Sequence, residues 1–372
     1  MPFSLFQKFF SFIGWLQPVK VKANLMRSKS IRNKAGHPGA EIKENRSTGV
    51  LKTKVVLPVA IICNLPQIEI NPLMFSPSPW LHLRIPFSYF LLPVYLFALG
   101  LSPNFTEYRI IWSFIIVHLL LYPASNGYNS YFDKDEQSIG GLKNPPPVTK
   151  GLYYIALLFD FLAIALALKI SMLFATMLLF YGLASKAYSH PLIRLKKYPV
   201  GGWLTTGFFQ GFFSLLMCYE GLNAFGANGL LRGHLIVAAL LTSVLLWASY
   251  PMTQVYQHAE DRQRGDHTLS LRLGVRGTFI FSGVLFGLAS IGFVLFFNTF
   301  YKAIYSMIFL LLLSPVVLYF CYWFFKVWKD TSRADYNHTM WLNFISATCL
   351  NIFFIYFFLD SSQVLQAIKA GF

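Results

Sequence analysis

Long apolar segments alternate with short polar loops from about residue 80 to residue 362. A helix needs about 20 mostly apolar residues to cross the hydrocarbon core of a bilayer. No stretch shows the strict alternation of a half-buried strand, and several connections are short, so an all-α bundle of antiparallel neighbours is favoured. We predict nine membrane-spanning helices, at residues 84–101, 108–125, 151–169, 171–188, 201–222, 234–256, 277–297, 303–324 and 340–359.

The chain divides into three parts on this pattern. Residues 1–79 are predicted to be a flexible basic extension, because eleven Lys and Arg but only two acidic residues precede position 55. Residues 80–362 form the transmembrane domain, and residues 363–372 form a short tail.

Composition and charge fit a membrane protein. The chain is 55% hydrophobic and only 12% charged, whereas soluble domains carry about 25% charged residues. The net charge of +16 indicates loops on the cytoplasmic face and no nucleic-acid partner. The loops after the second, fourth, sixth and eighth helices carry fourteen Lys and Arg, and the opposite loops with the tail carry five. We therefore expect a multi-pass protein of the plasma (inner) membrane, with its N-terminus and these four loops in the cytoplasm.

The loop after the second helix, residues 126–147, reads NGYNSYFDKDEQSIGGLKNPPP. The whole chain has fifteen acidic residues, and this loop places three of them within four positions, Asp133, Asp135 and Glu136. Asn129, Asp133 and Gln137 are spaced i, i+4, i+8, so they share one face of a helix. Such a row of oxygens suits Mg²⁺ bound together with the phosphates of a substrate. The alternative is a solvated acidic loop.

The loop after the sixth helix repeats this spacing. Gln257, Asp261 and Gly265 stand at i, i+4, i+8, and Glu260 lies beside Asp261. Two acidic loops on one membrane face, with Lys and Arg nearby, indicate a pocket for diphosphate and its metal ions. A transporter's ion site would instead be expected near the middle of the membrane.

These elements resemble those of the UbiA-type intramembrane prenyltransferases, although the aspartate-rich motifs are degenerate. The family's first motif reads roughly N-D-x-x-D-x-x-x-D and is followed by an N-K-P-x-R-P-like turn; residues 129–137 and 143–147 take these places. The second motif reads roughly D-x-x-x-D-x-x-x-G-x-x-T-L-x-x-x-L-G, and this chain matches it at Asp261, Gly265, Thr268, Leu269, Leu273 and Gly274.

Two shorter elements extend the resemblance, which covers about residues 83–359. The family's Y-S-x-P…L-K element is present as residues 188–191 with Leu195 and Lys196. Arg84 and Pro86 resemble the Arg and Pro at the start of the family's first helix. Three ordered elements in a nine-helix pattern are more specific than one acidic loop alone.

The resemblance implies a UbiA-like nine-helix fold and a Mg²⁺-dependent enzyme. The enzyme would transfer a prenyl group from a polyprenyl diphosphate to an often aromatic acceptor among the membrane lipids, as in quinone or prenylated-lipid biosynthesis. Two alternatives remain open. One is a terpene cyclase-like enzyme that uses the same diphosphate site, and the other is a non-catalytic transporter or lipid-binding relic.

The resemblance also assigns roles to residues of this chain. Asn129, Asp133 and Asp261 would hold metal, and Tyr188 would line the site near the allylic carbon. Asp133, Asp261 and Tyr188 are therefore the expected catalytic residues. The diphosphate is expected to meet Asn129 and four basic residues, Lys196, Arg262, Arg84 and Arg194.

The chain departs from the family pattern at three positions. Ser130 replaces the leading aspartate of the first motif, and Gln137 and Gln257 stand at outer aspartate positions. An amide oxygen can bind Mg²⁺ but contributes no charge. Further candidate ligands are therefore the two amides and the neighbouring carboxylates, namely Gln137, Gln257, Asp135, Glu136 and Glu260.

Two features inside the membrane belong to this hypothesis. Asp160 lies near the middle of segment 151–169 and is expected either to face the cavity or to be a hydrogen-bonded structural residue. Aromatic faces can stabilise a carbocation, and segment 201–222 supplies four candidates whose alternative role is packing, Phe208, Phe209, Phe212 and Phe213.

Overall fold

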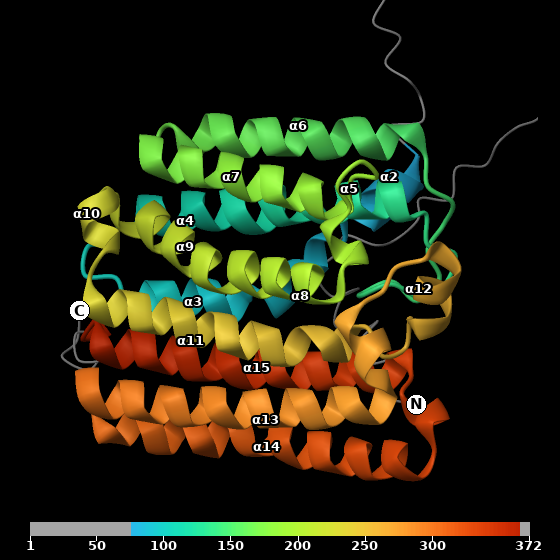
Figure 1. The fold of residues 1–372 in the computed structure, drawn as a ribbon. Coiled ribbons are helices and arrows are strands. Elements are labelled where there is room, and N and C mark those ends of the chain that lie inside the picture. Colours follow the sequence, from blue (N-terminus) through green and yellow to red (C-terminus); the bar gives the residue numbers. More distant parts are fainter. Residues whose placement is uncertain (1–75, 365–372) are drawn as a thin grey trace, which may run out of the picture. The chain divides into compact units, whose positions relative to one another are not determined.

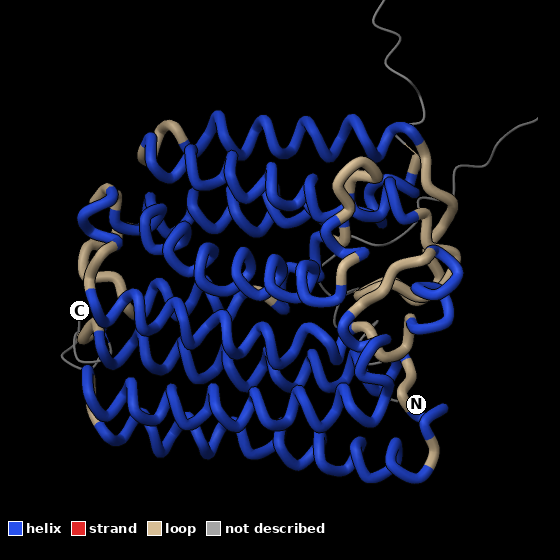
Figure 2. Tube along the Cα trace, viewed as in Figure 1, coloured by secondary structure: helices blue, strands red, loops and turns tan. Residues whose placement is uncertain are grey.

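The computed structural model describes residues 76–364, and every regular element among them is helical. The predicted extension 1–79 and tail 363–372 lie almost wholly outside the described residues, so that division of the chain stays a prediction. The described unit is a bundle whose long helices run side by side (Figures 1 and 2). The all-α prediction is confirmed for this unit.

The first half of the bundle contains several interrupted helices. In chain order the elements are α2 (Pro77–Leu83), η3 (Ile85–Phe90), α3 (Leu92–Gly100), α4 (Glu107–Phe114), η4 (Ile115–Leu121), α5 (Tyr122–Asp133), α6 (Lys150–Ala167), α7 (Met172–Ser189), η5 (Leu195–Lys197), α8 (Pro199–Gly207), η6 (Phe208–Phe213), α9 (Ser214–Asn223) and α10 (Ala227–Leu230).

The second half contains the longest helices. Its elements are α11 (Gly233–Ser249), η7 (Tyr250–Thr253), α12 (His258–Arg264), α13 (Leu269–Phe300), α14 (Ala303–Lys329), η8 (Thr331–Arg333) and α15 (Tyr336–Ser361). Within the described unit, α6 and α7 form one edge of the bundle and α13 and α14 form the other (Figure 1).

Within residues 76–364, six helices are long and apolar enough to cross a membrane, and a bent pair, Pro77–Phe90 with Leu92–Gly100, would make a seventh. These seven correspond to seven of the nine predicted segments. The other two, 171–188 and 201–222, are also helical, but they are not among the six spans. The number nine therefore stays a prediction.

Helix ends and interruptions follow from local chemistry. Ser171, Thr268 and Asp335 precede α7, α13 and α15, and each accepts a hydrogen bond from a backbone N–H of the first turn. The π-helical turn η4 ends two residues before Pro123, which has no N–H to donate to the preceding turn. The backbone N–H of Tyr122 accordingly reaches the carbonyl of Val117, five residues back.

The second π-helical turn, η6, marks a close contact with α11. The Ser243 hydroxyl accepts a hydrogen bond from the Phe212 backbone N–H at 2.8 Å and donates one to the Gly207 carbonyl, also at 2.8 Å. A side chain inserted into a helix ladder in this way widens the turn. Gly211 permits the approach, because a Cβ there would lie 2.5 Å from the Cα of Ser243.

We expect Gly211→Ala to lower the free energy of unfolding by about 1–3 kcal/mol, because the new methyl group forces α11 away from η6. Unfolding of the purified protein in detergent measures the effect. Gly287→Ala on α13 is the matched control, since a Cβ there meets no atom within 4 Å. Equal stability of the two variants would contradict this account of η6.

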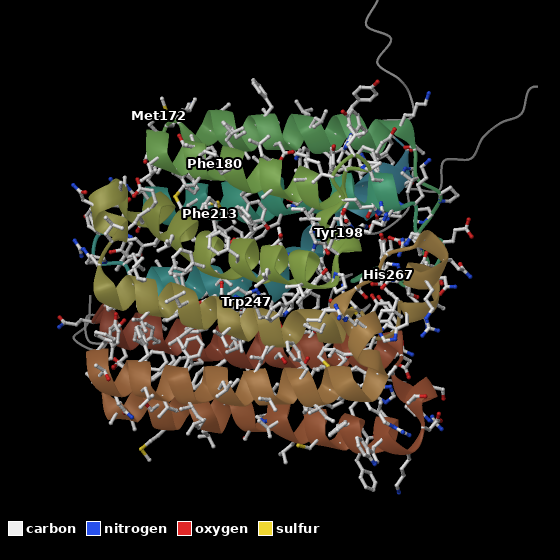
Figure 3. All side chains as sticks on the ribbon, viewed as in Figure 1. Met172, Phe180, Tyr198, Phe213, Trp247 and His267 are labelled. Carbon is white, nitrogen blue, oxygen red and sulfur yellow. The ribbon has the colours of Figure 1, made fainter. Side chains whose placement is uncertain are left out.

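The three polar segments singled out in the sequence meet at one end of the bundle. Helix α12, the C-terminal end of α5 and the segment containing η5 lie at this end, and α10 lies at the other (Figure 1). Tyr198 and His267 mark the polar end, and Met172 lies at the opposite end (Figure 3). A backbone hydrogen bond of 3.1 Å from His267 N–H to the Lys197 carbonyl joins two of the segments. The fold thus assembles a site from distant parts of the chain.

Candidate active site

A cavity of about 740 Å³ extends from this polar end into the bundle. Its polar lining comes from α5, α7, η5 and the residues around α12. Its deeper wall is mostly apolar and comes from α3, α13, α14 and α15. The cavity therefore joins a charged mouth to a hydrophobic interior.

The first acidic segment contributes the end of α5. Asn129 and Asp133 both line the cavity, as their i, i+4 spacing predicts. Asn129 Oδ1 accepts a hydrogen bond of 2.8 Å from the Ser189 hydroxyl. The helix ends at Asp133 because Lys134 adopts a left-handed conformation with φ 51°. This turn lets Asp135 line the same cavity, where it is 8% exposed.

The next two residues point away from the site. Glu136 and Gln137 are exposed and do not line the cavity. The backbone N–H of Glu136 donates a 3.3 Å hydrogen bond to Glu260 Oε1, which connects the two acidic segments. Glu260 is buried, but it also lies outside the cavity lining.

The second acidic segment places Gln257 and Asp261 in the cavity lining. Asp261 is 5% exposed and accepts 3.3 Å hydrogen bonds from Thr268 Oγ1 and Arg264 Nη2. Helix α12 ends at Arg264, and the next residue, Gly265, has a φ of 71° that favours glycine. The chain then turns Asp266 into the cavity.

The basic residues of the site pair with these carboxylates. Lys196 forms an ion pair with Asp133. Arg194 binds Asp266 through two hydrogen bonds of 2.8 Å, and its Nη2 lies 3.7 Å from Asp133. Two hydrogen bonds between one guanidinium and one carboxylate fix both side chains strongly.

Arg264 connects the two acidic segments. It pairs with Asp135 of the first segment and with Asp261 of its own segment, and it lies 4.0 Å from Glu260 and 3.8 Å from Asp266. Although burial alone lowers the pKa of Arg264, the surrounding carboxylates raise it above its ordinary value. The guanidinium therefore stays charged at the centre of an acidic cluster.

The pKa values of Asp261 and Asp266 are shifted in opposite directions. Burial raises the pKa of Asp261 to about 6, and the charge of Arg264 acts in the opposite direction. Burial also acts to raise the pKa of Asp266, but the hydrogen bonds from Arg194 and the charge of Lys196 hold it below its usual range. Asp266 thus keeps its charge at neutral pH, whereas the charge of Asp261 depends on nearby cations such as Arg264.

The donor set fits Mg²⁺ held jointly with an anionic ligand. Among residues 76–364, no group of three or more His, Cys, Asp or Glu could hold a metal ion by itself. Mg²⁺ is commonly bound through one or two carboxylates, water and substrate phosphates rather than by a complete protein cage. The cavity lining offers such oxygens on both acidic segments, from Asn129, Asp133, Asp135, Gln257, Asp261 and Asp266.

Two tyrosines connect the mouth to its inner wall. The Tyr188 and Tyr250 hydroxyls are hydrogen-bonded to each other. Gln254 Nε2 donates a 3.0 Å hydrogen bond to the Tyr250 hydroxyl. All three residues line the cavity, and the position of Tyr188 relative to an allylic carbon stays a prediction.

The two remaining arginine candidates lie in different surroundings. Arg84 lines the cavity, and its guanidinium donates hydrogen bonds to the Gly140 carbonyl at 3.1 Å and the Asn126 carbonyl at 3.4 Å. Arg262 is exposed and lies in a separate surface hollow with His267. The structure therefore does not bring Arg262 together with the other candidates.

Of the candidates inside the membrane, only some line the cavity. Asp160 forms an ion pair with Lys186 and does not line the cavity, which matches the structural alternative. Of the four phenylalanines, Phe209 lines the cavity and Phe208, Phe212 and Phe213 do not.

Several polar residues of the cavity lining were missed from the sequence, among them Tyr250, Gln254, Arg264 and Asp266. Two of them carry signals that could have been used. Arg264 stands three positions after Asp261, and Asp266 is one of only fifteen acidic residues in the chain. Nothing in the sequence distinguishes Tyr250 or Gln254 from other polar residues at a helix end.

A model of the UbiA prenyltransferase family matches residues 89–348, which is more than two thirds of the chain. Among solved structures, the chain is similar to a UbiA homolog from Archaeoglobus fulgidus bound to DMAPP and Mg²⁺, at 17% identity and a TM-score of 0.57, over 77% of this chain and 100% of that one. It is also similar to the apo structure of a UbiA homolog from Aeropyrum pernix K1, at 18% identity and a TM-score of 0.58, over 73% of this chain and 98% of that one. At such identities the likeness shows a shared fold. No curated protein matches the chain.

Proposed function

Because the chain belongs to the UbiA prenyltransferase family and is therefore an integral membrane prenyltransferase, we propose that it transfers a prenyl group from a polyprenyl diphosphate to a small, often aromatic acceptor. The main support for this proposal is the lining of the cavity. Buried carboxylates and cations from three distant segments line one cavity whose deeper wall is apolar. Such a cavity suits a molecule with an anionic head and a hydrocarbon tail.

The charged mouth is the proposed diphosphate site. Asn129, Asp133 and Asp261 would hold Mg²⁺, with Asp135 and Gln257 as further oxygen donors from the same lining. When bound, Mg²⁺ neutralises negative charge on the diphosphate oxygens and so makes the diphosphate a better leaving group. The Archaeoglobus fulgidus homolog is bound to DMAPP and Mg²⁺, which supports a Mg²⁺ requirement here by analogy.

Cations of the chain add to this neutralisation. Lys196 and Arg264 line the cavity, and Arg194 is held beside it by Asp266. Preorganised positive charge stabilises the negative charge that develops as the allylic C–O bond breaks and the diphosphate leaves with the electron pair. Arg84 donates to backbone carbonyls of the first acidic segment, so its role would be to shape the mouth.

The allylic carbocation left by this step needs a dry, aromatic environment. Tyr188 and Phe209 line the cavity, and an aromatic face stabilises a cation by about 0.5–2 kcal/mol. The acceptor forms the new bond to the allylic carbon and then loses a proton. The prenyl tail would lie along the apolar wall of α13, α14 and α15, because each buried CH₂ contributes about 0.8 kcal/mol.

Quinone or prenylated-lipid biosynthesis remains the proposed setting. Placement in the plasma membrane, with the cavity mouth toward the cytoplasm, is also part of the proposal. Its support is the excess of Lys and Arg in the loops at the polar end.

The test uses membranes containing the full chain, labelled prenyl diphosphates of several lengths, Mg²⁺ and a panel of phenolic acceptors. A labelled acceptor product is the expected result. Diphosphate release with a cyclised hydrocarbon and no acceptor product would support the terpene cyclase-like alternative. Absence of release with every substrate would overturn both enzymatic readings.

We expect Gln257→Asp to be tolerated, with turnover of the same order as the original chain. The new carboxylate lines the cavity and strengthens the donor set for Mg²⁺. Steady-state rates at several Mg²⁺ concentrations measure the effect. Gln137→Asp is the matched control, because the same change there is exposed and outside the cavity. Loss of turnover in Gln257→Asp alone would show that the amide itself is required.

A further inference from the structure

The surface hollow that contains Arg262 is separate from the cavity. It has a volume of about 510 Å³ and is lined by Pro199, Arg262, His267, Leu271 and Arg272, none of which lines the cavity. Pro199 begins α8, and Leu271 lies in the first turn of α13. The hollow therefore lies between the starts of two helices that run away from the polar end (Figure 1).

The hollow is basic, and no acidic residue lines it. Arg262 and Arg272 are both exposed, and arginine keeps its positive charge in proteins. Within residues 76–364, neither side chain forms an ion pair or a hydrogen bond. Arg276, one turn further along α13, provides a contrast, because it donates a 2.8 Å hydrogen bond to the Trp328 carbonyl and lies over the Trp328 ring. The two arginines of the hollow are thus available to an external anion.

Beyond the hollow, both helices expose rows of apolar side chains. In each row the residues are spaced four apart, so they share one face of the helix. The ring centroids of Trp203 on α8 and Phe281 on α13 are 5.6 Å apart, so the two helices lie side by side. The exposed residues are Val200, Leu204 and Phe208 along α8 and η6, and Ile280, Val284 and Leu288 along α13. An anion in the hollow would therefore have lipid-facing helix surface next to it.

The hollow shares its chain segments with the charged mouth. Asp261 and Asp266 line the cavity, whereas the residue after each of them, Arg262 and His267, lines the hollow. The backbone N–H of His267 also donates to the Lys197 carbonyl at 3.1 Å, which joins this segment to the one before α8. A ligand in the hollow would thus contact the outer side of the segments that form the mouth.

We propose that this hollow binds the phosphate of an anionic phospholipid from the surrounding leaflet. The phosphate oxygens can accept hydrogen bonds from the guanidinium groups of Arg262 and Arg272. The acyl chains would then lie along the exposed rows of α8 and α13. A headgroup that carries its own cation fits less well, because the two arginines already supply positive charge at this place. A soluble phosphate fits less well too, because nothing concentrates it at the membrane surface.

Equilibrium binding to the purified full chain in neutral detergent micelles tests this proposal. Dioleoylphosphatidylglycerol and dioleoylphosphatidylcholine share their chains and phosphate, and glycerophosphoglycerol is the first headgroup without chains. The phosphatidylglycerol should bind about tenfold more tightly than the phosphatidylcholine, and glycerophosphoglycerol should bind at least about tenfold more weakly than the phosphatidylglycerol. Equal binding of the two lipids would overturn the proposal. Equally tight binding of glycerophosphoglycerol would overturn it in favour of a site for soluble anions.

Variants locate the preference for the anionic lipid. The double variant Arg262→Gln/Arg272→Gln should reduce the tenfold difference to less than about threefold. Lys326→Gln/Lys329→Gln is the matched control, because it removes two charges at the end of α14, outside the hollow, and it should leave the difference unchanged. Both variants keep the basic sequence before residue 55, so its attraction for anionic lipid is common to them. Loss of the preference in both double variants, or in neither, would contradict the assignment to the hollow.

Amide hydrogen exchange of the original chain gives a second measurement that depends on no substitution. Phosphatidylglycerol should slow exchange at residues 196–200 and 262–272 relative to phosphatidylcholine, because these segments surround the hollow. Protection only in other loops, or no protection, would overturn the proposal. Neither measurement requires turnover, so failure here is distinguishable from failure of the proposed prenyl transfer.

Discussion

Asp133→Asn should lower kcat/KM for prenyl transfer by about 10²–10³-fold, which is the usual effect of removing one preorganised electrostatic contact. Asp133 lines the cavity, ends α5 and forms an ion pair with Lys196. Asparagine keeps the size and one oxygen but removes the negative charge that would hold Mg²⁺. Initial rates over a range of prenyl diphosphate and Mg²⁺ concentrations measure the loss.

Glu136→Gln is the matched control for this prediction. It removes the same charge from the same segment, but Glu136 is exposed and lies outside the cavity. We expect the control to keep the original rate and both variants to insert into membranes equally well. Activity in Asp133→Asn close to that of the original chain, or an equal loss in Glu136→Gln, would remove Asp133 from the metal site.

Most of the fold could be predicted from the spacing of apolar residues. Segments such as 303–324 and 340–359 are long and uniformly apolar, and they correspond to α14 and α15. The interruptions were less predictable. The break at Gly211 depends on Ser243, a residue of another helix, so no local pattern could reveal it. Pro123 is a local signal, but proline does not specify whether a helix kinks or forms a π-helical turn.

The site was predicted best where helical periodicity applies. Asn129 and Asp133 share a helix face and both line the cavity, whereas Gln137 was placed on that face by extending the helix too far. The left-handed turn at Lys134 ends α5 and directs Asp135 inward instead. Side-chain direction beyond a helix end depends on the turn that follows, which spacing alone does not reveal.

The same limitation applies to the second acidic segment. Helix α12 is short, and its turns bring Arg264 and Asp266 into the cavity while Arg262 stays exposed. Neighbouring basic residues cannot be told apart by charge counting. The distinction required knowing that Arg264 faces Asp135, which lies 129 residues earlier in the chain.

The positions of Gln137 and Gln257 in the structure bear on why neutral amides can stand where the family pattern has aspartates. Gln137 is exposed, so its lack of charge has little effect on the cavity. Gln257 does line the cavity, but Asp135 and Asp266 supply additional carboxylates there. Arg264 and Arg194 in turn hold these carboxylates in place. We propose that Asp135 and Asp266 supply the negative charge that Gln257 lacks.

The stability of this mouth should depend on Arg264. We expect Arg264→Gln to lower the free energy of unfolding by about 3 kcal/mol, since removing one partner of a buried ion pair leaves an uncompensated charge. The Arg264 side chain is 19% exposed, and that of its partner Asp135 is 5% exposed. Arg262→Gln is the matched control, because Arg262 is exposed and lies outside the cavity. Unfolding in detergent and amide hydrogen exchange at residues 134–142 and 258–268 measure the change.

The loss of Arg264 should also alter the charge of Asp261. The guanidinium acts to hold down the pKa of Asp261, which is already about 6, so the pKa of Asp261 should rise further in Arg264→Gln. Asp261 would then take up a proton near neutral pH, and less carboxylate would be available to Mg²⁺. The double variant Arg264→Gln/Asp135→Asn removes both partners, and it should recover about 1–3 kcal/mol relative to the sum of the single changes. Additive effects of the two substitutions, or equal stability of Arg264→Gln and Arg262→Gln, would show that Arg264 does not hold the acidic segments together.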